Sequence, residues 1–292
     1  CVFPLNEECF SRQIMRIAYQ GEPGAYSEAA ALRIKPTADV LPQESFEAVF
    51  MAVKEGISTH GILPIENTIG GTIHQNYDLL LQYELPIVGE VKQPIVHNLL
   101  AFGGTPREML RRVYSHPQGL AQCERFLRTL DNVELVPTYD TAGSAKMIRD
   151  GELRDTGAIA SQRAADIFGL TILEAGVQDF ADNTTRFLLV GRDATPFGTP
   201  NKTTVVFTVT NDAGALFKAL SVFALRDIDL TKLESRPIPE RPFEYLFYAD
   251  LSGTRDDLPC TRALMHLAEF APMLRTLGSY PRWEEPVPDA PK

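Results

Sequence analysis

The stretch Asp179-Phe-Ala-Asp-Asn-Thr-Thr-Arg-Phe-Leu-Leu-Val190 runs from polar and charged residues directly into an apolar segment. The apolar end, 187–190, is typical of a buried strand, and it brings Thr185 and Arg186 to the mouth of that strand. Side chains at strand ends often form the ligand sites of α/β scaffolds. We therefore expect site residues in this stretch, which is also a candidate for a crossing between two lobes.

Upstream of this stretch, short apolar runs alternate with amphipathic segments. The expected strands cover 16–20, 61–65, 113–115, 133–137, 157–160 and 170–173. The expected helices cover 25–34, 45–53, 72–83, 120–130, 141–150 and 161–168, and Ser45 is the candidate N-cap of the second helix. Strands that alternate with helices predict the α/β class, with a mostly parallel sheet covered by helices.

The strand-biased stretch 85–102, which Pro94 interrupts, is the other candidate crossing. Together with the return crossing, it divides the region 16–193 into two lobes. Lobe 1 is expected to contain about 16–93 and 177–193, and lobe 2 about 94–176. Two crossings between lobes imply a cleft, which is a common place for a small-molecule site.

The residues after 193 are expected to form a separate unit. Residues 192–202 are rich in Pro, Gly and Thr and lack periodicity, so they are the best linker candidate. Residues 203–281 have the order strand, helix, strand, strand, helix, strand, which is the ferredoxin-like βαββαβ pattern of the α+β class. We expect 1–15 to be an N-terminal extension and 282–292 to be a frayed tail.

The composition argues against several classes of protein. With 292 residues, a net charge of −10 and a pI of about 5.1, the chain is not expected to bind nucleic acid or an anionic membrane surface. The four cysteines, at positions 1, 9, 123 and 260, are too scattered for a metal site or a disulfide framework, and they predict reduced thiols in a cytoplasmic protein. No apolar run is long enough for a membrane span, and the first ten residues are unlike a signal peptide.

Three loops at strand-to-helix junctions carry polar groups. Gly21-Glu-Pro-Gly-Ala-Tyr-Ser27 offers amides that can bind a carboxylate, or it is an ordinary turn. Pro64-Ile-Glu-Asn-Thr68 offers a carboxylate, an amide and a hydroxyl, or it only caps a helix. Tyr114-Ser-His-Pro-Gln118 places Ser115 as an N-cap or an anion ligand and His116 as a general base or a solvated side chain, with Gln122 one turn further on.

These groups suit one kind of chemistry. The sequence shows no nucleophile elbow, phosphate loop, dinucleotide fingerprint or His-Glu-x-x-His motif. The candidate site is polar and rich in hydroxyls, which suits the positioning of an anion that is already reactive. In the C-terminal unit, the turn 211–217 and the strand 233–237 form either a ligand notch at a subunit interface or only a loop and a sheet edge.

Several motifs occur together in the order and spacing of one family. They are Gly21-Glu-Pro-Gly-Ala-Tyr-Ser27, Pro64-Ile-Glu-Asn67, Asn76-Tyr-Asp-Leu-Leu80, Ser115-His-Pro-Gln118 with Gln122-Cys123, Asp140-Thr-Ala-Gly143 and Thr185-Arg-Phe187. From about residue 16 to residue 281, the chain closely resembles prephenate dehydratase and its plant relative, arogenate dehydratase. The part after the linker resembles an ACT regulatory domain, with the signature segments Gly214-Ala-Leu-Phe217 and Glu234-Ser-Arg-Pro237.

The resemblance implies a fold and a reaction. The catalytic part would have two lobes, like a periplasmic binding protein, with the active site in the cleft. Prephenate would lose carbon dioxide and its ring hydroxyl to give phenylpyruvate and water in L-phenylalanine biosynthesis, without a metal or an organic cofactor. The ACT domain would bind L-phenylalanine as a feedback effector in a homodimer or homotetramer. Because no chorismate mutase helix precedes Arg16, the resemblance also implies the monofunctional arrangement.

The resemblance further assigns roles to residues. Thr185 would donate a hydrogen bond to the departing hydroxyl, because a threonine is too weak an acid to be a full proton source. The other expected catalytic residues are Glu66, a possible proton source, and Asn67. The expected substrate-binding residues are Thr68, Ser115, Gln122, Arg186 and Phe187, with a structural role for Arg186 as the alternative. The expected L-phenylalanine site, across a dimer interface, consists of Asn211, Ala213, Gly214, Ala215, Leu216, Phe217, Glu234 and Ser235.

Two other functions fit the same motifs. An arogenate dehydratase would differ only in accepting an amino group where prephenate has a keto group. An amino-acid-binding regulatory protein would keep the ACT domain but have an inactive dehydratase site, and the intact Asn67, Ser115 and Thr185 argue against it.

Overall fold

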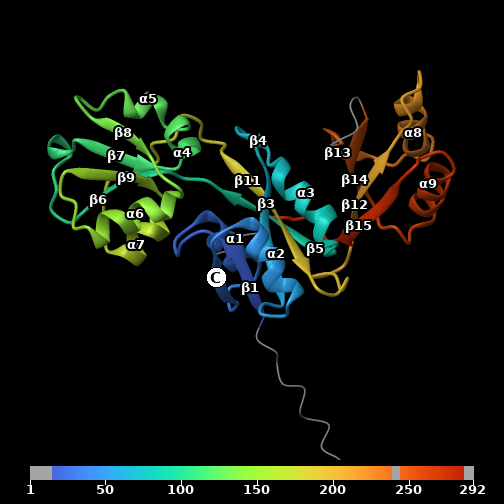
Figure 1. Cartoon of the computed structure of the whole chain (residues 1–292), viewed down its shortest axis with the longest axis horizontal. Helices are drawn as coiled ribbons and strands as arrows, with labels where there is room; N and C mark the ends of the chain where they lie inside the picture. The colour runs from blue at the N-terminus through green and yellow to red at the C-terminus, as the bar shows by residue number, and fades with distance from the viewer. Residues whose placement is uncertain (1–14, 239–243, 286–292) are drawn as a thin grey trace, which may run out of the picture.

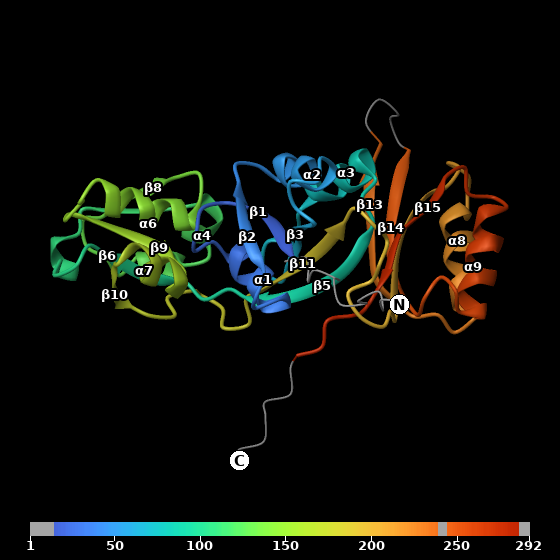
Figure 2. The same ribbon diagram turned by 90° about the horizontal axis from the view of Figure 1, so that it is seen from below.

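The computed structural model describes residues 15–238 and 244–285, which form three β-sheets. The three sheets lie in a row, with lobe 2 at one end, lobe 1 in the middle and the C-terminal unit at the other end (Figure 1, Figure 2). The expected extension lies almost wholly outside the described residues, as does much of the expected tail.

Lobe 1 is a six-stranded sheet with the order β2-β1-β3-β11-β5, in which β4 pairs with β3. Its strands are β1 (Arg16–Gln20), β2 (Asp39–Gln43), β3 (His60–Asn67), β4 (Gly71–Thr72), β5 (Ile87–Pro94) and β11 (Thr184–Gly191). Its helices are α1 (Tyr26–Ile34), α2 (Phe46–Lys54) and α3 (His74–Tyr83). β1 is parallel to β2 and β3, whereas β11 is antiparallel to both of its neighbours.

Two details of lobe 1 bear on the sequence predictions. Ser45 caps α2 as expected, because its hydroxyl accepts a hydrogen bond from Ala48 N at 3.1 Å. The sequence does not predict β2, which contains Pro42. A proline cannot donate to a strand ladder, and β2 tolerates one because it pairs only with β1 and lies at the edge of the sheet.

Lobe 2 is a five-stranded sheet with the order β10-β6-β9-β7-β8. Its strands are β6 (Asn98–Ala101), β7 (Arg112–Ser115), β8 (Glu134–Pro137), β9 (Thr156–Ala160) and β10 (Thr171–Glu174). Its helices are α4 (Pro117–Ala121), α5 (Glu124–Leu127), α6 (Thr141–Asp150), α7 (Gln162–Phe168) and the 3₁₀ helix η1 (Arg107–Met109). The prediction of one helix over 120–130 is therefore wrong, because α4 ends at Ala121 and a separate short helix follows.

The expected parallel character holds only for part of each lobe. In lobe 2, β7 is parallel to β8 and β9, whereas β6 is antiparallel to β9 and β10. The antiparallel strands are those next to the two crossings, since the chain enters lobe 2 at β6 and leaves it after β10. The return strand β11 then inserts between β3 and β5, with Thr185 opposite Asn67 and Arg186 opposite Glu66.

The C-terminal unit is a four-stranded antiparallel sheet with the order β13-β14-β12-β15. Its elements are β12 (Lys202–Thr208), α8 (Ala215–Ala224), β13 (Leu230–Pro237), β14 (Tyr245–Ser252), α9 (Leu258–Ala268) and β15 (Leu274–Tyr280). Helices α8 and α9 cover the face of the sheet that points away from lobe 1 (Figure 1). The chain thus has the expected α/β class, with two lobes and a ferredoxin-like βαββαβ unit.

The other face of this sheet packs against lobe 1. Val206, Leu246 and Tyr248 join the hydrophobic core beneath α2 and α3, and the rings of Tyr77 and Tyr248 lie 4.4 Å apart. At the closest approach, a Cβ added to Gly278 would lie only 2.1 Å from the Ile87 carbonyl oxygen. The backbones of β15 and β5 can therefore come together only because position 278 has no side chain.

Candidate active site

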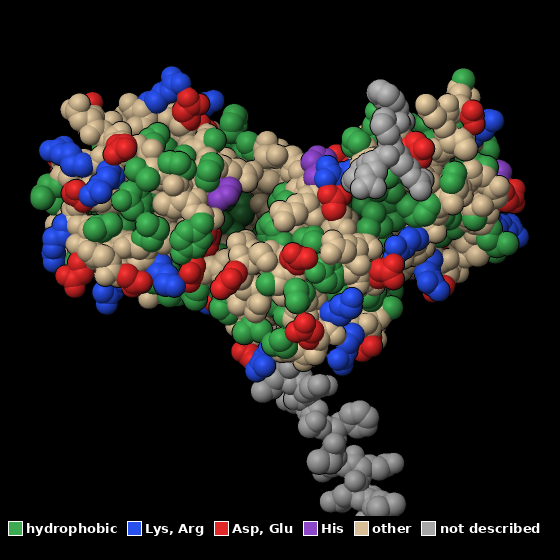
Figure 3. Space-filling view, in the orientation of Figure 1, with side chains coloured by type: hydrophobic (Ala, Val, Ile, Leu, Met, Phe, Trp, Pro, Cys, Tyr) green, Lys and Arg blue, Asp and Glu red, His purple; other side chains and the backbone are tan. Residues whose placement is uncertain are grey.

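A cavity of about 380 Å³ lies between the two lobes. Figure 3 shows the hollow between them, with a histidine near its rim. The polar side chains that line the cavity are Gln20, Tyr26, Ser27, Ser45, Asn67, Gln75, His97, His116, Gln118, Gln122, Tyr139, Asp140, Thr141 and Thr185. The lining includes Phe187 but no Arg or Lys among the described residues.

The starts of several helices supply positive potential in place of side-chain cations. Tyr26 and Ser27 at the start of α1 and Thr141 at the start of α6 line the cavity. Ser45, the N-cap of α2, also lines it. The first amides of a helix have no partner within the helix and carry the positive end of its dipole, so they attract anions. The cavity is therefore suited to a carboxylate although the protein is acidic overall.

Asn67 has a fixed orientation at the centre of the cavity wall. Its Oδ1 accepts hydrogen bonds from Ile69 N at 3.0 Å and Gly70 N at 2.7 Å, so this atom is the carbonyl oxygen. Its Nδ2 consequently donates, and its shortest bonds are to Asn183 Oδ1 at 2.7 Å and Thr185 Oγ1 at 2.9 Å.

The same reasoning fixes the Thr185 hydroxyl. Because Oγ1 accepts from Asn67 Nδ2, the hydroxyl hydrogen is left to donate, and no acceptor for it exists among the described residues. Thr185 is only 7% exposed and lines the cavity. The Thr185 hydroxyl, near the first residue of β11, is thus set up to donate to a ligand in the cavity.

The hydrogen bonds continue from Asn67 into lobe 2. Asn183 Nδ2 donates to Gln122 Oε1 at 2.9 Å, and His97 Nε2 lies 2.9 Å from the same oxygen. Since Oε1 is an acceptor, His97 carries a hydrogen on Nε2, and its Nδ1 lies 3.1 Å from the Tyr26 hydroxyl, which donates to Val96 O at 2.7 Å. Burial lowers the pKa of His97, although its bond to Gln122 acts in the opposite direction, so His97 is neutral at pH 7.

A second group of contacts joins the lobes at the rim. Lys146 Nζ bonds both carboxylate oxygens of Glu22 at 3.1 and 3.0 Å, and the Tyr139 hydroxyl donates to Glu22 Oε1 at 3.2 Å. Burial and the Glu22 charge raise the pKa of Tyr139 to about 12, so it remains a donor. Asp140 Oδ2 accepts from Glu22 N at 3.0 Å. These contacts hold the start of α6 against the loop before α1.

The comparisons with known proteins agree with this geometry. Residues 17–195 match the family model described as prephenate dehydratase. The chain belongs to the prephenate dehydratase family. Arogenate dehydratase/prephenate dehydratase 6, chloroplastic, from Arabidopsis thaliana is 49% identical over 284 residues, which cover 91% of this chain and 69% of that protein. Arogenate dehydratase 2 from Petunia hybrida is 49% identical over 283 residues, which cover 91% of this chain and 72% of that protein.

Two solved structures are similar over nearly the whole chain. The prephenate dehydratase from Arthrobacter aurescens in complex with L-Phe has a TM-score of 0.83 and 30% identity, and the match covers 91% of this chain and 89% of that one. A protein described as GqqA, a novel type of quorum quenching acylase, has a TM-score of 0.84 and 35% identity, with 92% and 98% of the two chains covered.

Four of the residues expected from the family resemblance line the cavity together. They are Asn67 on β3, Gln122 after α4, and Thr185 and Phe187 on β11. Asn67 and Thr185 share a hydrogen bond, and Gln122 Nε2 lies 3.4 Å from Asn67 Oδ1. The structure thus brings residues from both lobes to the cavity between the lobes.

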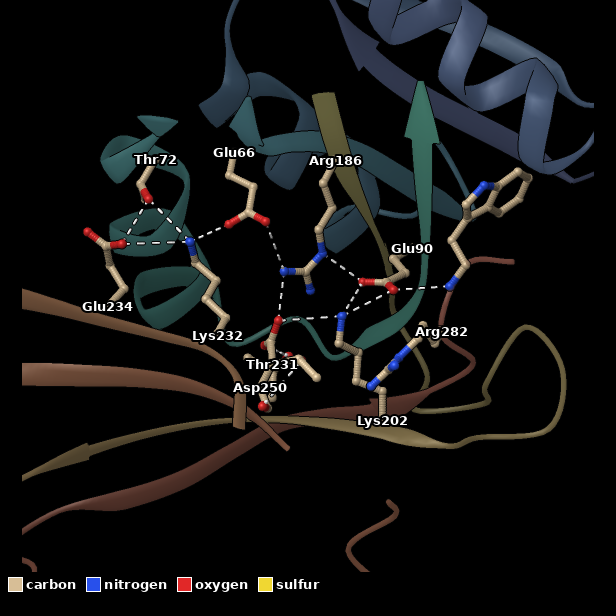
Figure 4. A network of polar contacts seen from close by, with 12 residues as sticks. Glu66, Thr72, Glu90, Arg186, Lys202, Thr231, Lys232, Glu234, Asp250 and Arg282 are labelled. Carbon is tan, nitrogen blue, oxygen red and sulfur yellow. Dashed lines mark hydrogen bonds and ion pairs between the residues drawn. The ribbon is translucent and has the colours of Figure 1, made fainter. Parts of the chain in front are cut away.

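Arg186 and Glu66 lie on the other side of the sheet, so the expectation that Arg186 binds substrate is not supported. Successive side chains of a strand point to opposite faces, and Thr185 and Phe187 face the cavity. Arg186 is buried toward the C-terminal unit, 2.7 Å from Glu90 and 2.7 Å from Asp250 (Figure 4). Glu66 contacts Lys232 and lies 3.8 Å from Arg186, so the structure gives no support to its role as a proton source.

The group around Arg186 is a buried charge network that we call the interdomain cluster: Arg186, Glu90, Lys202 and Asp250. Lys202 Nζ lies 2.9 Å from Glu90 and 3.6 Å from Asp250 (Figure 4). Burial alone would raise the pKa values of Glu90 and Asp250, but Arg186 and Lys202 hold both values below the ordinary range. Two cations and two carboxylates therefore compensate one another between lobe 1 and the C-terminal unit.

Thr68 and Ser115 do not line the cavity, and their expected contacts with the substrate stay a prediction. The Thr68 hydroxyl donates to Asp182 O at 2.9 Å and accepts from Thr184 N at 3.0 Å, which braces the loop before β11. Ser115 is fully buried and donates to Ile159 O at 2.8 Å. The N-cap of α4 is His116 rather than Ser115, since the His116 side chain accepts from Gln118 N.

The sequence predicts no functional role for several residues of the site. His97 follows Pro94 in the first crossing, and Asn183 precedes β11 in the second. Tyr139 and Asp140 lie at the start of α6. Asp140 belongs to a quoted motif, and the positions of His97 and Asn183 on the two crossings are signals that could have been used. Tyr139 has no signal of this kind.

Proposed function

We propose that this chain is a hydro-lyase that removes carbon dioxide and the ring hydroxyl from prephenate or from its amino analogue, arogenate. The observation that carries this is the Thr185 hydroxyl, whose hydrogen is directed into the cavity because Asn67 donates to its oxygen. The departing hydroxide needs a hydrogen-bond donor, and loss of carbon dioxide makes the ring aromatic, so the substrate supplies the driving force. The helix starts around the cavity would hold the substrate carboxylates.

The choice of substrate depends on the group at the side-chain carbon. Prephenate, the expected substrate, has a keto group there, and arogenate has an ammonium. Asp140 is the one carboxylate among the cavity-lining residues that the structure describes, and this observation supports arogenate as the second candidate. A comparison of kcat/KM for the two substrates tests the choice. If Asp140 recognises the ammonium, Asp140→Asn lowers kcat/KM for arogenate while leaving prephenate nearly unchanged.

The same geometry argues against hydrolysis of an amide, the activity suggested by the acylase relative. A threonine nucleophile needs a base that accepts its proton. The hydrogen-bond partner of Thr185 Oγ1 is an amide nitrogen, which donates and cannot take a proton. An acylase assay with an N-acyl amide, beside the prephenate assay, separates the two activities.

For regulation, we propose that L-phenylalanine binds the C-terminal unit as an ACT domain and that the protein is a homodimer or homotetramer. The Arthrobacter aurescens relative in complex with L-Phe supports the ligand. Gly214, the N-cap of α8, has a φ of +80°, and Phe217 in the first turn of this helix is 76% exposed. Ser235 is exposed on the edge strand β13. In the described residues, no hydrogen bond joins 211–217 to 233–235, so a second subunit would complete the site.

One expected effector residue is already engaged. Glu234 accepts a hydrogen bond from Thr72 at 2.9 Å and lies 3.6 Å from Lys232, so its side chain points to lobe 1 (Figure 4). Calorimetry with L-phenylalanine tests the site: we expect binding by wild type and its loss in Ser235→Tyr, which would block the edge of β13. Light scattering on the same samples gives the oligomeric state, and binding by a monomer would contradict the shared site.

The described residues contain no helix that could cross a membrane and no group of three or more His, Cys, Asp or Glu that could hold a metal ion. A cytoplasmic location stays a prediction, because the name of the Arabidopsis thaliana relative includes the word chloroplastic.

A further inference from the structure

Asn183 does not line the cavity, but its side chain joins two residues that do, Asn67 and Gln122. It is 1% exposed, and its backbone carbonyl accepts from Ile95 N at 2.8 Å, so the two crossings between the lobes are joined at this residue. Its side-chain oxygen accepts from Asn67 of lobe 1, and its side-chain nitrogen donates to Gln122 of lobe 2. Both functional atoms of the carboxamide are therefore used, one toward each lobe.

Two backbone amides fix the direction of every hydrogen bond in this side-chain network. Ile69 N and Gly70 N fix Asn67 Oδ1 as an acceptor, so Asn67 Nδ2 donates to Asn183 Oδ1. Asn183 Nδ2 must then donate to Gln122 Oε1. Gln122 Nε2 consequently faces Asn67 Oδ1, and His97 Nε2 donates to Gln122 Oε1. A flip of any one amide would set two donors or two acceptors against each other.

We propose that Asn183 is a positioning residue for the dehydration: its carboxamide locks Asn67 and Gln122 in the orientation that directs the Thr185 hydroxyl hydrogen to the substrate. This inference rests on the proposed function. Asn183 does not line the cavity, and it acts through its hydrogen bonds to Asn67 and Gln122. This role requires a side chain at position 183 that has the size of asparagine and carries one donor and one acceptor. A residue that only fills space would not need these two groups.

Asn183→Asp tests this requirement, because the two side chains have the same shape. An ionised aspartate only accepts, so its second oxygen would oppose Gln122 Oε1. A protonated aspartic acid has one donor and one acceptor and reproduces the native pattern. Burial favours the protonated form. We therefore expect the kcat of Asn183→Asp to be lower than that of wild type at alkaline pH, on the order of 10- to 100-fold, and to recover as the pH falls.

The matched control is Asn98→Asp in lobe 2. Asn98 is also buried, at 3% exposure, and also uses both amide atoms, accepting from Gly176 N and donating to Ala160 O. It does not line the cavity. Asn98→Asp is expected to lower stability while its kcat keeps the pH profile of wild type. Asn183→Ala removes both hydrogen bonds, and its kcat should be low at every pH, with KM changed less than kcat.

The outcomes are separable. Initial rates are measured with prephenate and with arogenate across the pH range, with the enzyme-free rate subtracted and folding checked by circular dichroism. Failure of wild type to turn over either substrate would overturn the proposed function and this inference with it. An active wild type with Asn183→Asp and Asn183→Ala within twofold of its kcat would overturn the inference alone. A decrease in the kcat of Asn183→Asp that does not change with pH would also overturn the inference. If Asn183→Asp does not fold, the kcat of Asn183→Ala tests the inference instead.

Discussion

Thr185 and Arg186 are neighbours in β11, yet their side chains lie on opposite faces of the lobe 1 sheet. Thr185 lines the cavity between the lobes, and Arg186 is buried between Glu90 of lobe 1 and Asp250 of the C-terminal unit. A displacement of this strand segment would therefore move both the Thr185 side chain in the cavity and the Arg186 side chain in the interdomain cluster. The pair gives the C-terminal unit a direct physical contact with the residue next to the proposed catalytic hydroxyl.

Removal of the Thr185 hydroxyl is expected to reduce kcat. Thr185→Val keeps the shape but loses the donor, and loss of one donor to a developing oxyanion typically costs about 10²- to 10³-fold in kcat. Thr185→Ser keeps the hydroxyl and should retain most of the activity. Thr184→Val is the matched control, since Thr184 does not line the cavity. Initial rates with the preferred substrate provide the measurement, and an active Thr185→Val would contradict the assigned role.

Replacement of Arg186 by Met is expected to affect stability more than substrate affinity. It would leave Glu90 and Asp250 with Lys202 as their remaining cation in the interdomain cluster, and breaking a buried ion pair typically costs about 3–5 kcal/mol. The exposed pair between Arg112 and Asp155 gives the control, because solvent screens it and Arg112→Met should lower stability far less than Arg186→Met. Urea unfolding and KM are measured on the same samples. A raised KM with unchanged stability would restore Arg186 as a substrate ligand.

The interdomain cluster should make the protein sensitive to acid. The pKa values of Glu90 and Asp250 are lower in the folded protein than their ordinary values of 4.5 and 3.8. The unfolded chain therefore binds protons first, and stability is lost as the pH falls below about 4.5 through the folded-state values. Glu90→Gln and Asp250→Asn should be less stable at pH 7 and should lose less on acidification. Free energies of unfolding measured between pH 7 and pH 3 test the slope, and an unchanged slope in both variants would count against it.

Gly278→Ala should weaken the contact between the C-terminal unit and lobe 1. The added Cβ would lie 2.1 Å from Ile87 O, so β15 and β5 must move apart, and overpacking of this kind typically costs about 1–3 kcal/mol. Gly103→Ala is the control, because the nearest atom to its added Cβ is 4.0 Å away. We expect a lower unfolding temperature and faster proteolysis in the segment 192–201 for Gly278→Ala only. Equal behaviour of the two variants would refute the close-approach argument.

The lobes, their crossings and the βαββαβ unit were predictable because each rests on a local pattern. The apolar runs around Ile62, Leu189 and Val206 identify buried strands without any tertiary information. What could not be predicted depends on neighbours distant in sequence. The position of β2 at a sheet edge, which permits Pro42, follows from the strand order. The antiparallel insertion of β11 likewise depends on where the chain returns.

The candidate site was predictable in part for the same reason. Thr185 and Asn67 were assigned from the resemblance, and the structure brings them within hydrogen-bond distance of each other. The sequence could have predicted that Arg186 and Glu66 face away from Thr185 and Asn67, because adjacent residues of a strand face opposite sides. The sequence could not have predicted that the Ser115 hydroxyl is already bonded, since its bond to Ile159 O depends on how β7 pairs with β9.

The insertion of β11 between β3 and β5 also sets an order of assembly during synthesis. All strands of lobe 2, from β6 to β10, leave the ribosome before β11, so lobe 2 can complete its sheet first. The lobe 1 sheet stays incomplete until residue 191 has been synthesised, because β11 pairs with the edges of β3 and β5 that face each other. We therefore expect a nascent chain released before residue 184 to contain one finished lobe and one incomplete lobe. The Thr185 hydroxyl and the Asn67 amide, on which the proposed reaction depends, therefore come into contact only when β11, the last strand of lobe 1 to be synthesised, joins the sheet.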